Sequence, residues 1–256
     1  TRSSSVTGVQ TCALPIYSKL CFPFSRDLSV TKNNILLLVG RDDWQKDEAL
    51  NLALLNKLRT NNVEVVWEDP AAEVIHFLRK IESKIGILPK RIRRFNLRMI
   101  QILYGLLNPS YLAYLYKRKS NDVLSRCESL ANTICTRGIA AQTIILSRSS
   151  GGRVSSLIAD QLGIKHVVCL GYPFKHPDHG DEPERYAHLA QLKTPMLIIQ
   201  GVDDEYGGLE IEDKYVLSEK IEVSFLNTNH NFDISDAMAH EIVELIERVT
   251  GLSKKT

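Results

Sequence analysis

The sequence predicts an α/β protein with a mostly parallel sheet that is covered by helices on both faces. From residue 32 onward, short apolar runs alternate with segments of helical periodicity, which is the pattern of this fold class. The apolar runs are nearly continuous, as expected of parallel strands that are buried on both faces. The length of 256 residues, of which 44% are hydrophobic, suits one globular domain with a sizeable core.

The individual elements follow from this alternation. The expected strands are 35–39, 63–67, 143–146, 166–170, 196–200 and 223–226, and the expected helices are 45–60, 122–137, 151–162, 211–219 and 235–250. In the last helix, apolar residues recur at spacings of three and four: Ile242, Leu245, Ile246 and Val249. That face of the helix is therefore expected to pack on the sheet.

Residues 70–120 do not fit the alternation and are predicted to form a cap-like helical insertion. Within them, Phe95 to Leu107 is apolar except for one stripe of residues three or four apart, which predicts a helix that Asn108-Pro109 ends. The apolar face and the basic flanks, Lys90 to Arg94 and Lys117 to Lys119, favour either burial against the sheet or a lid in weak contact with an anionic membrane surface. A membrane span is disfavoured because the segment contains Arg98, Gln101, Asn108 and Pro109.

Residues 1–16 are not expected to belong to the fold. The translation of a common sequencing-library adapter resembles Val6 to Ile16, so we interpret this segment as a disordered artefact. The native sequence is then expected to begin near Tyr17, and 17–256 is expected to form a single domain. A natural flexible tail is the alternative. A signal peptide is disfavoured because the segment lacks a continuous apolar region of the needed length.

Charge and cysteine usage narrow the classes of partner. The 32 basic and 30 acidic residues leave a formal charge of +2, which indicates a small-molecule partner rather than a nucleic acid. The five cysteines lie scattered without a C-x-x-C pair, so neither a zinc site nor a disulfide framework is predicted, and a cytoplasmic location fits best. His176, His179 and Asp181 lie close in sequence, but their spacing matches no metal-ligand pattern, and a polar loop is the preferred interpretation.

A turn rich in serine and glycine follows the third predicted strand. Residues 147–152, SRSSGG, lead from that strand into a helical segment, which is the context of a nucleophile elbow, G-x-S-x-G. The elbow is tight, so the residues two before and two after the nucleophile must be small. Centring on Ser149 places Ser147 and Gly151 there, whereas centring on Ser150 would place an arginine there. Ser149 is therefore the predicted nucleophile, with a serine at 147 where glycine is usual; a turn that merely opens a helix is the alternative.

A candidate acid and base follow the serine along the chain. Serine needs an imidazole to take its proton and a carboxylate to fix the imidazole tautomer. The fifth predicted strand leads to Asp203 and Asp204, and the sixth leads to His230, so both loops lie at the carboxyl edge of the sheet. Ser149, Asp204 and His230 are the predicted nucleophile, acid and base, in the chain order of the α/β-hydrolase fold. Asp203 is the alternative acid, and solvated loop positions are the alternative for the acid and the base.

Four blocks of sequence resemble one family of this fold. The blocks are RSSGGR at 148–153, LGYPFKHP at 170–177, LKTP at 192–195 leading into GVDD at 201–204, and NH at 229–230. The stretch is similar to a small intracellular family that includes a testis-expressed protein and a subunit of the NSL histone-acetyltransferase complex, whose members resemble dienelactone-hydrolase-type enzymes. The resemblance implies the same three roles for Ser149, Asp204 and His230.

The loop after the first strand departs from the pattern of these relatives. Most have a His-Gly or glycine-rich loop that supplies an oxyanion-hole N–H, whereas this chain has VGRDDW at 39–44. Because backbone donors do not depend on side-chain identity, the N–H groups of Ser150 and Arg41 are the predicted oxyanion donors, with Asp42 as the alternative to Arg41. The aspartates of this loop are expected to cap the helix that starts near Trp44.

Together these features predict a carboxylesterase-like serine hydrolase that cleaves a small acyl ester through an acyl-Ser149 intermediate, with no cofactor and no metal. A non-catalytic binding or scaffold protein is the alternative, because a fold does not fix a function. The loop at 39–44 and the serine at 147 favour the scaffold. The intact order of serine, acid and histidine favours the enzyme.

Overall fold

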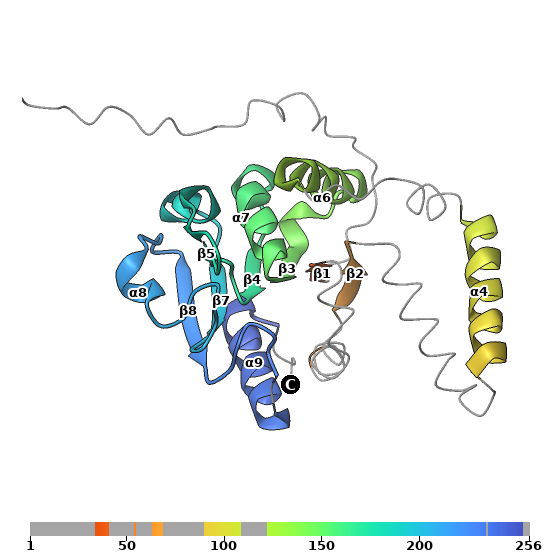
Figure 1. The fold of residues 1–256 in the computed structure, drawn as a ribbon. Helices are drawn as coiled ribbons and strands as arrows, with labels where there is room; N and C mark the ends of the chain where they lie inside the picture. Colours follow the sequence, from red (N-terminus) through yellow and green to blue (C-terminus); the bar gives the residue numbers. More distant parts are fainter. Residues whose placement is uncertain are drawn as a thin grey trace, which may run out of the picture. The chain divides into compact units, whose positions relative to one another are not determined.

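A parallel sheet forms the centre of the described structure, a computed structural model that covers residues 34–40, 54, 63–68, 90–108, 122–233 and 235–252 (Figure 1). In sheet order the strands are β2 (Glu64–Trp67), β1 (Ile35–Val39), β3 (Thr143–Arg148), β4 (His166–Leu170), β7 (Met196–Gly201) and β8 (Ile221–Leu226). Every neighbouring pair in this sheet is parallel. The predicted α/β fold class and the predicted strands are therefore confirmed.

The order of the strands reverses between β1 and β3. The chain passes from β1 outward to β2 and then adds β3, β4, β7 and β8 in succession on the other side of β1. In an open parallel sheet, ligands bind at such a reversal, outside the carboxyl ends of the strands. Val39 at the end of β1 pairs with Ser147 near the end of β3. The turn that follows β3 therefore lies where this topology favours a binding site.

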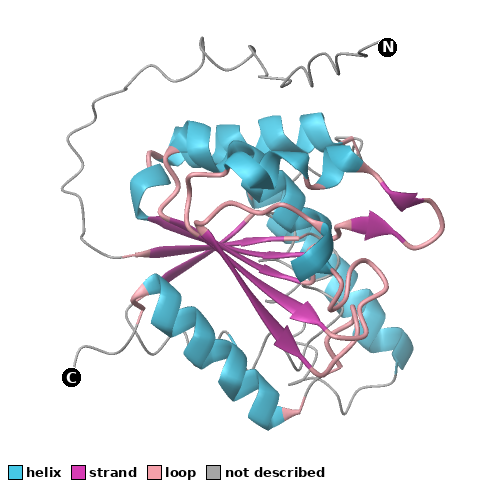
Figure 2. Cartoon of the chain, turned by 90° about the vertical axis from the view of Figure 1, so that its left-hand side faces the viewer, coloured by secondary structure: helices cyan, strands magenta, loops and turns pink. Residues whose placement is uncertain are grey.

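Helices cover both faces of the sheet. They are α6 (Val123–Arg137) and α7 (Ser150–Leu162) on one side and α9 (Asp236–Thr250) on the other (Figure 2). One apolar cluster joins the sheet to α9, and it includes Leu36, Leu146 and Leu197 of the strands and Ile242 and Ile246 of the helix. Removal of this surface from water is the main favourable contribution to folding.

Capping residues set the ends of these helices. Asp122 accepts a hydrogen bond from the Ser125 N–H (2.9 Å) at the start of α6, and Ser235 accepts one from the Met238 N–H (3.3 Å) at the start of α9. Left-handed glycines follow the last residues of α6, α7 and α9: Gly138, Gly163 and Gly251. Glycine adopts this conformation without steric cost, so each helix ends at it.

The helix α4 (Lys90–Leu107) is the described part of the predicted insertion. It begins five residues before the predicted start at Phe95 and ends where predicted. The Asn108 side chain donates a hydrogen bond to the Tyr104 carbonyl oxygen (3.0 Å) just past its last turn. Among the described residues, no helix combines the length and apolar character needed to cross a membrane. Contact of the insertion with a membrane surface stays a prediction.

The predicted helix at 211–219 is wrong in its length, because α8 spans only Ile211–Lys214. Its continuation is prevented by tertiary hydrogen bonds: the Ser218 N–H donates to the Leu189 carbonyl oxygen (3.1 Å), and the Ser218 hydroxyl donates to the Leu192 carbonyl oxygen (2.6 Å). These bonds draw the chain toward the segment before β7. The conformational preference of a short segment is easily overridden by such contacts.

The predicted polar loop after β4 contains a short antiparallel pair, β5 (Lys175–His176) and β6 (Gly180–Asp181). Other predictions lie outside the described residues. These are the tail at 1–16, the start of the domain at 17, the helix at 45–60 except for Leu54, and the flanks of the insertion before Lys90 and after Asn108.

Candidate active site

Ser149 occupies a sharp turn between β3 and α7. Its φ of 47° lies in a region that residues other than glycine rarely adopt. Hydrogen bonds fix both sides of the turn: the Ser149 N–H donates to the Leu170 carbonyl oxygen (3.0 Å), and the Ser149 carbonyl oxygen accepts from the Gly152 N–H (2.8 Å). This is the strand–turn–helix geometry of a nucleophile elbow.

The residues on either side of Ser149 explain why the turn is tolerated. A Cβ at Gly151 would lie 2.8 Å from the Val39 carbonyl oxygen, so only glycine fits there. Ser147, where glycine is usual, is fully buried, and its hydroxyl donates to the Val168 carbonyl oxygen of β4 (2.8 Å). The Ser147 hydroxyl, which a glycine would lack, therefore has a hydrogen-bond acceptor within the sheet.

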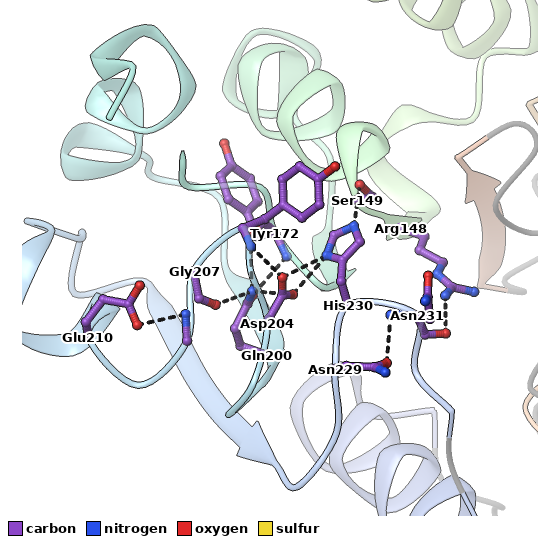
Figure 3. Close-up of polar contacts among 12 residues, drawn as sticks. Arg148, Ser149, Tyr172, Gln200, Asp204, Gly207, Glu210, Asn229, His230 and Asn231 are labelled. Atoms are coloured by element: carbon purple, nitrogen blue, oxygen red, sulfur yellow. Dashed lines mark hydrogen bonds and ion pairs between the residues drawn. The ribbon is translucent and has the colours of Figure 1, made fainter. Parts of the chain in front are cut away.

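Ser149, His230 and Asp204 are brought together at the carboxyl edge of the sheet, as Figure 3 shows. His230 Nε2 lies 3.0 Å from Ser149 Oγ, and His230 Nδ1 lies 3.0 and 2.9 Å from the two carboxylate oxygens of Asp204. The Asp204 side chain is fully buried, whereas the His230 side chain is 18% exposed. Asp203, the alternative acid, is exposed. A neutral imidazole with Nδ1–H donated to Asp204 would present Nε2 as the acceptor for the serine proton.

Asp204 is held by two further donors. The Gln200 Nε2 amide donates to Asp204 Oδ2 (2.8 Å), and the Tyr206 N–H donates to Asp204 Oδ1 (2.8 Å). Hydrogen bonds to an ionised group are stronger than those between neutral groups, so a buried carboxylate is stabilised here. Gln200 did not emerge from the sequence as a site residue. The available signal was a lone amide at the end of an otherwise apolar strand, Met196–Ile199.

Gly171 and Tyr206 lie against the Asp204–His230 pair. Gly171, with φ of 66°, follows β4, and a Cβ there would lie 3.3 Å from His230 Nδ1 and 3.4 Å from Asp204 Oδ2. The absence of a side chain thus leaves room for the pair. The ring of Tyr206 packs against the His230 imidazole, with centroids 4.3 Å apart. This contact restrains the orientation of the imidazole from its other side.

Arg148 ties the elbow to the loop that carries His230. This buried side chain donates from Nη2 to the Asn231 carbonyl oxygen (2.5 Å), and its guanidinium lies 5.8 Å from the centre of the Phe232 ring. Phe232 has a φ of 54°, a conformation that needs support from its surroundings. The sequence did not predict this structural role for Arg148, which lies in the RSSGGR block and excludes Ser150 as the apex on steric grounds.

Of the two predicted oxyanion donors, only Ser150 lies among the described residues. Ser150 is the first residue of α7, so its N–H has no acceptor within the helix and remains available to a ligand. Arg41 lies outside the described residues, as does Asp42. Gly40, the last described residue of that loop, approaches the elbow closely, since a Cβ at Gly151 would lie 3.1 Å from its Cα.

Burial sets the ionisation of two groups beside the site. It raises the pKa of the Cys169 thiol to about 12, so this cysteine stays protonated at neutral pH and is a poor nucleophile. Burial, together with the Glu205 and Asp204 carboxylates, also raises the pKa of Tyr206. Both side chains are therefore neutral at neutral pH.

The histidines considered for a metal lie on the β5–β6 hairpin. The rings of His176 and His179 pack in a tilted arrangement with centroids 4.4 Å apart, and Asp181 accepts a hydrogen bond from the Tyr215 hydroxyl (2.7 Å). Within the described ranges, no cluster of three or more histidine, cysteine or acidic side chains is arranged to hold a metal ion.

The fold is shared with solved structures at low sequence identity. They include lip1 from Acinetobacter baumannii AYE (TM-score 0.53, 12% identity, 87% of this chain and 86% of that chain covered) and the esterase domain of a Rhodothermus marinus protein (0.51, 12%, 85% and 88%). Est1E from Butyrivibrio proteoclasticus is a third (0.50, 9%, 88% and 91%). No curated protein gives a significant match in sequence. The model of the alpha/beta hydrolase domain matches residues 110–255, and the chain therefore belongs to the α/β-hydrolase family.

Proposed function

We propose that the protein is a serine hydrolase that cleaves small carboxylic esters through an acyl-Ser149 intermediate. The observation that carries the proposal is the continuous hydrogen-bonded chain from Ser149 Oγ through His230 to the buried Asp204, with contacts of 3.0 and 2.9 Å. An exposed or unsupported histidine would not have this arrangement. The strained φ of Ser149 supports the same role, because such strain is characteristic of nucleophile elbows.

In the acylation step, Ser149 Oγ forms a bond to the ester carbonyl carbon while His230 Nε2 takes the hydroxyl proton. Asp204 accepts the Nδ1–H hydrogen bond and stabilises the imidazolium that forms. The tetrahedral intermediate then collapses, the bond between the carbonyl carbon and the alcohol oxygen breaks, and the alcohol leaves with the proton from Nε2.

In the deacylation step, water replaces the alcohol. His230 takes a proton from the water as its oxygen attacks the acyl carbon, and the bond to Ser149 Oγ then breaks. The proton returns to Ser149 and the carboxylic acid is released. No redox change occurs, and water is the only co-reactant besides the ester.

The negative charge on the carbonyl oxygen needs donors, for which we propose the N–H groups of Ser150 and Arg41. Donors at the N-terminus of α7 are favoured by the helix dipole as well as by their lack of an internal partner. We also retain the narrower hypothesis of a relative of dienelactone-hydrolase-type enzymes. It rests on the sequence blocks at 148–153 and 170–177, which flank the site.

Steady-state hydrolysis of a panel of short-chain esters tests the proposal. Ser149→Ala and His230→Ala should each lower kcat by roughly four to six orders of magnitude, and the double variant should be hardly worse than either, because the residues act as a unit. Ser129→Ala is the matched control, since this serine is exposed on α6. Equal rates in the wild type and Ser149→Ala would favour the scaffold alternative.

A further inference from the structure

The side chain of Gln200 lies at the centre of a hydrogen-bonded network that includes the Asp204 carboxylate. It is fully buried at the end of β7. Its Oε1 accepts from the Tyr172 N–H (2.9 Å), while its Nε2 donates to Asp204 Oδ2 (2.8 Å) and to the Gly207 carbonyl oxygen (2.7 Å). Figure 3 shows these contacts converging on one amide. One side chain thus connects the segment after β4 to both ends of the turn that carries Asp204.

The network fixes which way the amide points. The Tyr172 N–H requires an acceptor, and the Asp204 carboxylate and the Gly207 carbonyl require donors. A flipped amide would place its oxygen against both acceptors and its NH₂ group against a donor. The Tyr172 carbonyl oxygen, 3.3 Å from Nε2, adds a weaker acceptor on the same side. The orientation of Gln200 is therefore determined by all its neighbours at once.

We infer that Gln200 is a positioning residue that holds the Asp204 carboxylate in register with His230, an inference that rests on the proposed serine hydrolase function. Each carboxylate oxygen has its own donor in addition to the imidazole, Gln200 for Oδ2 and the Tyr206 N–H for Oδ1. With both oxygens held, the carboxylate cannot rotate away from Nδ1. Gln200 acts through Asp204 and does not itself reach Ser149.

The Gln200 amide also reduces the effect of the negative charge of Asp204 on His230. Donation to Oδ2 disperses the negative charge of the carboxylate, so its loss would leave Asp204 attracting the imidazolium more strongly. Besides Asp204, His230 contacts Ser149 Oγ and the Tyr206 ring, and Arg148 donates to the carbonyl oxygen of the next residue in the loop, Asn231. A substitution at Gln200 leaves those groups in place, so a change in proton affinity can be attributed to Asp204.

The variant Gln200→Met keeps the approximate volume and removes both donors. We expect kcat/KM for an ester to fall roughly 10- to 100-fold, the range for loss of a hydrogen bond to a charged group. The acidic limb of log(kcat/KM) against pH should move to higher pH, because the imidazole would hold its proton longer. Thr194→Val is the matched control. This substitution removes the hydrogen bond that the buried Thr194 donates from Oγ1 to Asp160 Oδ1 (2.7 Å), away from the site. It should leave the acidic limb of the pH profile at the same pH.

A second variant keeps the test informative if Gln200→Met fails to fold. Gln200→Glu preserves the shape, and its neutral acid can still donate to Asp204, whereas its ionised form repels Asp204. We expect a descending alkaline limb in kcat/KM that the wild type does not have. A profile for Gln200→Glu that parallels the wild type at all pH values would overturn the inference.

A spectroscopic measurement separates this inference from the proposed function. The proton on His230 Nδ1, bound to Asp204, should give a downfield resonance in the ¹H NMR spectrum that moves further downfield in Gln200→Met but not in Thr194→Val. If this shift appears while the wild type hydrolyses no ester, the positioning role stands and the hydrolase proposal fails. If the wild type is active and Gln200→Met matches it in rate, pH profile and resonance, the positioning role fails alone.

Discussion

Two serines, Ser149 just before α7 and Ser156 within it, each lie beside a histidine, and the difference between the two pairs shows what makes one a candidate for catalysis. Ser149 Oγ, at the start of the helix, lies 3.0 Å from His230 Nε2. Ser156 Oγ, two turns later, lies 2.8 Å from His188 Nε2. By distance alone the second pair is the better candidate. The distance between a serine and a histidine therefore does not identify a nucleophile.

The direction of the hydrogen bonds separates the two pairs. The Ser156 hydroxyl donates to the Arg153 carbonyl oxygen (3.1 Å), so His188 must be the donor in the bond between them. Burial, aided by the charge of Arg153, lowers the pKa of His188 to about 4. His188 thus holds the 3-10 segment Ala187–Gln191 against α7. His230, in contrast, contacts the Asp204 carboxylate through Nδ1 and the Ser149 hydroxyl through Nε2.

The largest effect on ester hydrolysis is expected from substitution of Asp204, the carboxylate that only the Ser149–His230 pair contacts. Asp204→Asn should lower kcat by about four orders of magnitude, because an amide can hold the wrong imidazole tautomer. Asp203→Asn, its exposed neighbour, is the matched control and should have a mild effect. Ester kinetics of both variants measure the difference, and a larger loss at 203 would exchange the two assignments.

A moderate effect on stability is expected at the second pair. Ser156→Ala leaves the His188 N–H without its partner in a mostly buried position, which should cost about 1–3 kcal/mol in the free energy of unfolding. The rate of ester hydrolysis at a temperature where the variant is folded should stay close to that of the wild type. Urea unfolding and ester kinetics together check this, and a loss of activity without a loss of stability would contradict the structural role.

A further prediction concerns how the free energy of unfolding depends on pH. Burial lowers the pKa of both His166 and His188 from 6.5 to about 4, so the unfolded chain binds more protons than the folded chain between these values. Stability should be full above pH 6.5 and fall as the pH is lowered toward 4, by up to about 1.4 kcal/mol per pH unit for each histidine. His188→Gln should make the slope of unfolding free energy against pH shallower; an unchanged slope would show that His188 is not buried in its neutral form.

Much of the fold follows from the sequence because its signals are local. Apolar runs of strand length predict β1, β3, β4 and β7, and the order of Ser149, Asp204 and His230 places them at one edge of a parallel sheet. The steric argument for Ser149 over Ser150 also needs only its immediate neighbours. Each of these inferences uses residues within a few positions of one another or a known topology.

The supporting residues could not be predicted because their partners are distant in the chain. Gln200 contacts Tyr172, which lies 28 positions away, and Arg148 contacts Asn231, which lies 83 positions away. A polar residue at the end of a strand has no local pattern that reveals such a partner. The end of α8 was missed for the same reason, since Ser218 is drawn to the segment before β7 by tertiary hydrogen bonds.

The most direct test of Ser149 as the nucleophile is labelling of the purified protein with a fluorophosphonate probe, followed by peptide mass spectrometry. An activated serine attacks such a probe, whereas a serine whose proton is committed elsewhere does not. We expect a label on Ser149 that is lost in Ser149→Ala, forms more slowly in His230→Ala and is retained in Ser156→Ala. No label on the wild type, or a label on Ser156 in place of Ser149, would contradict it.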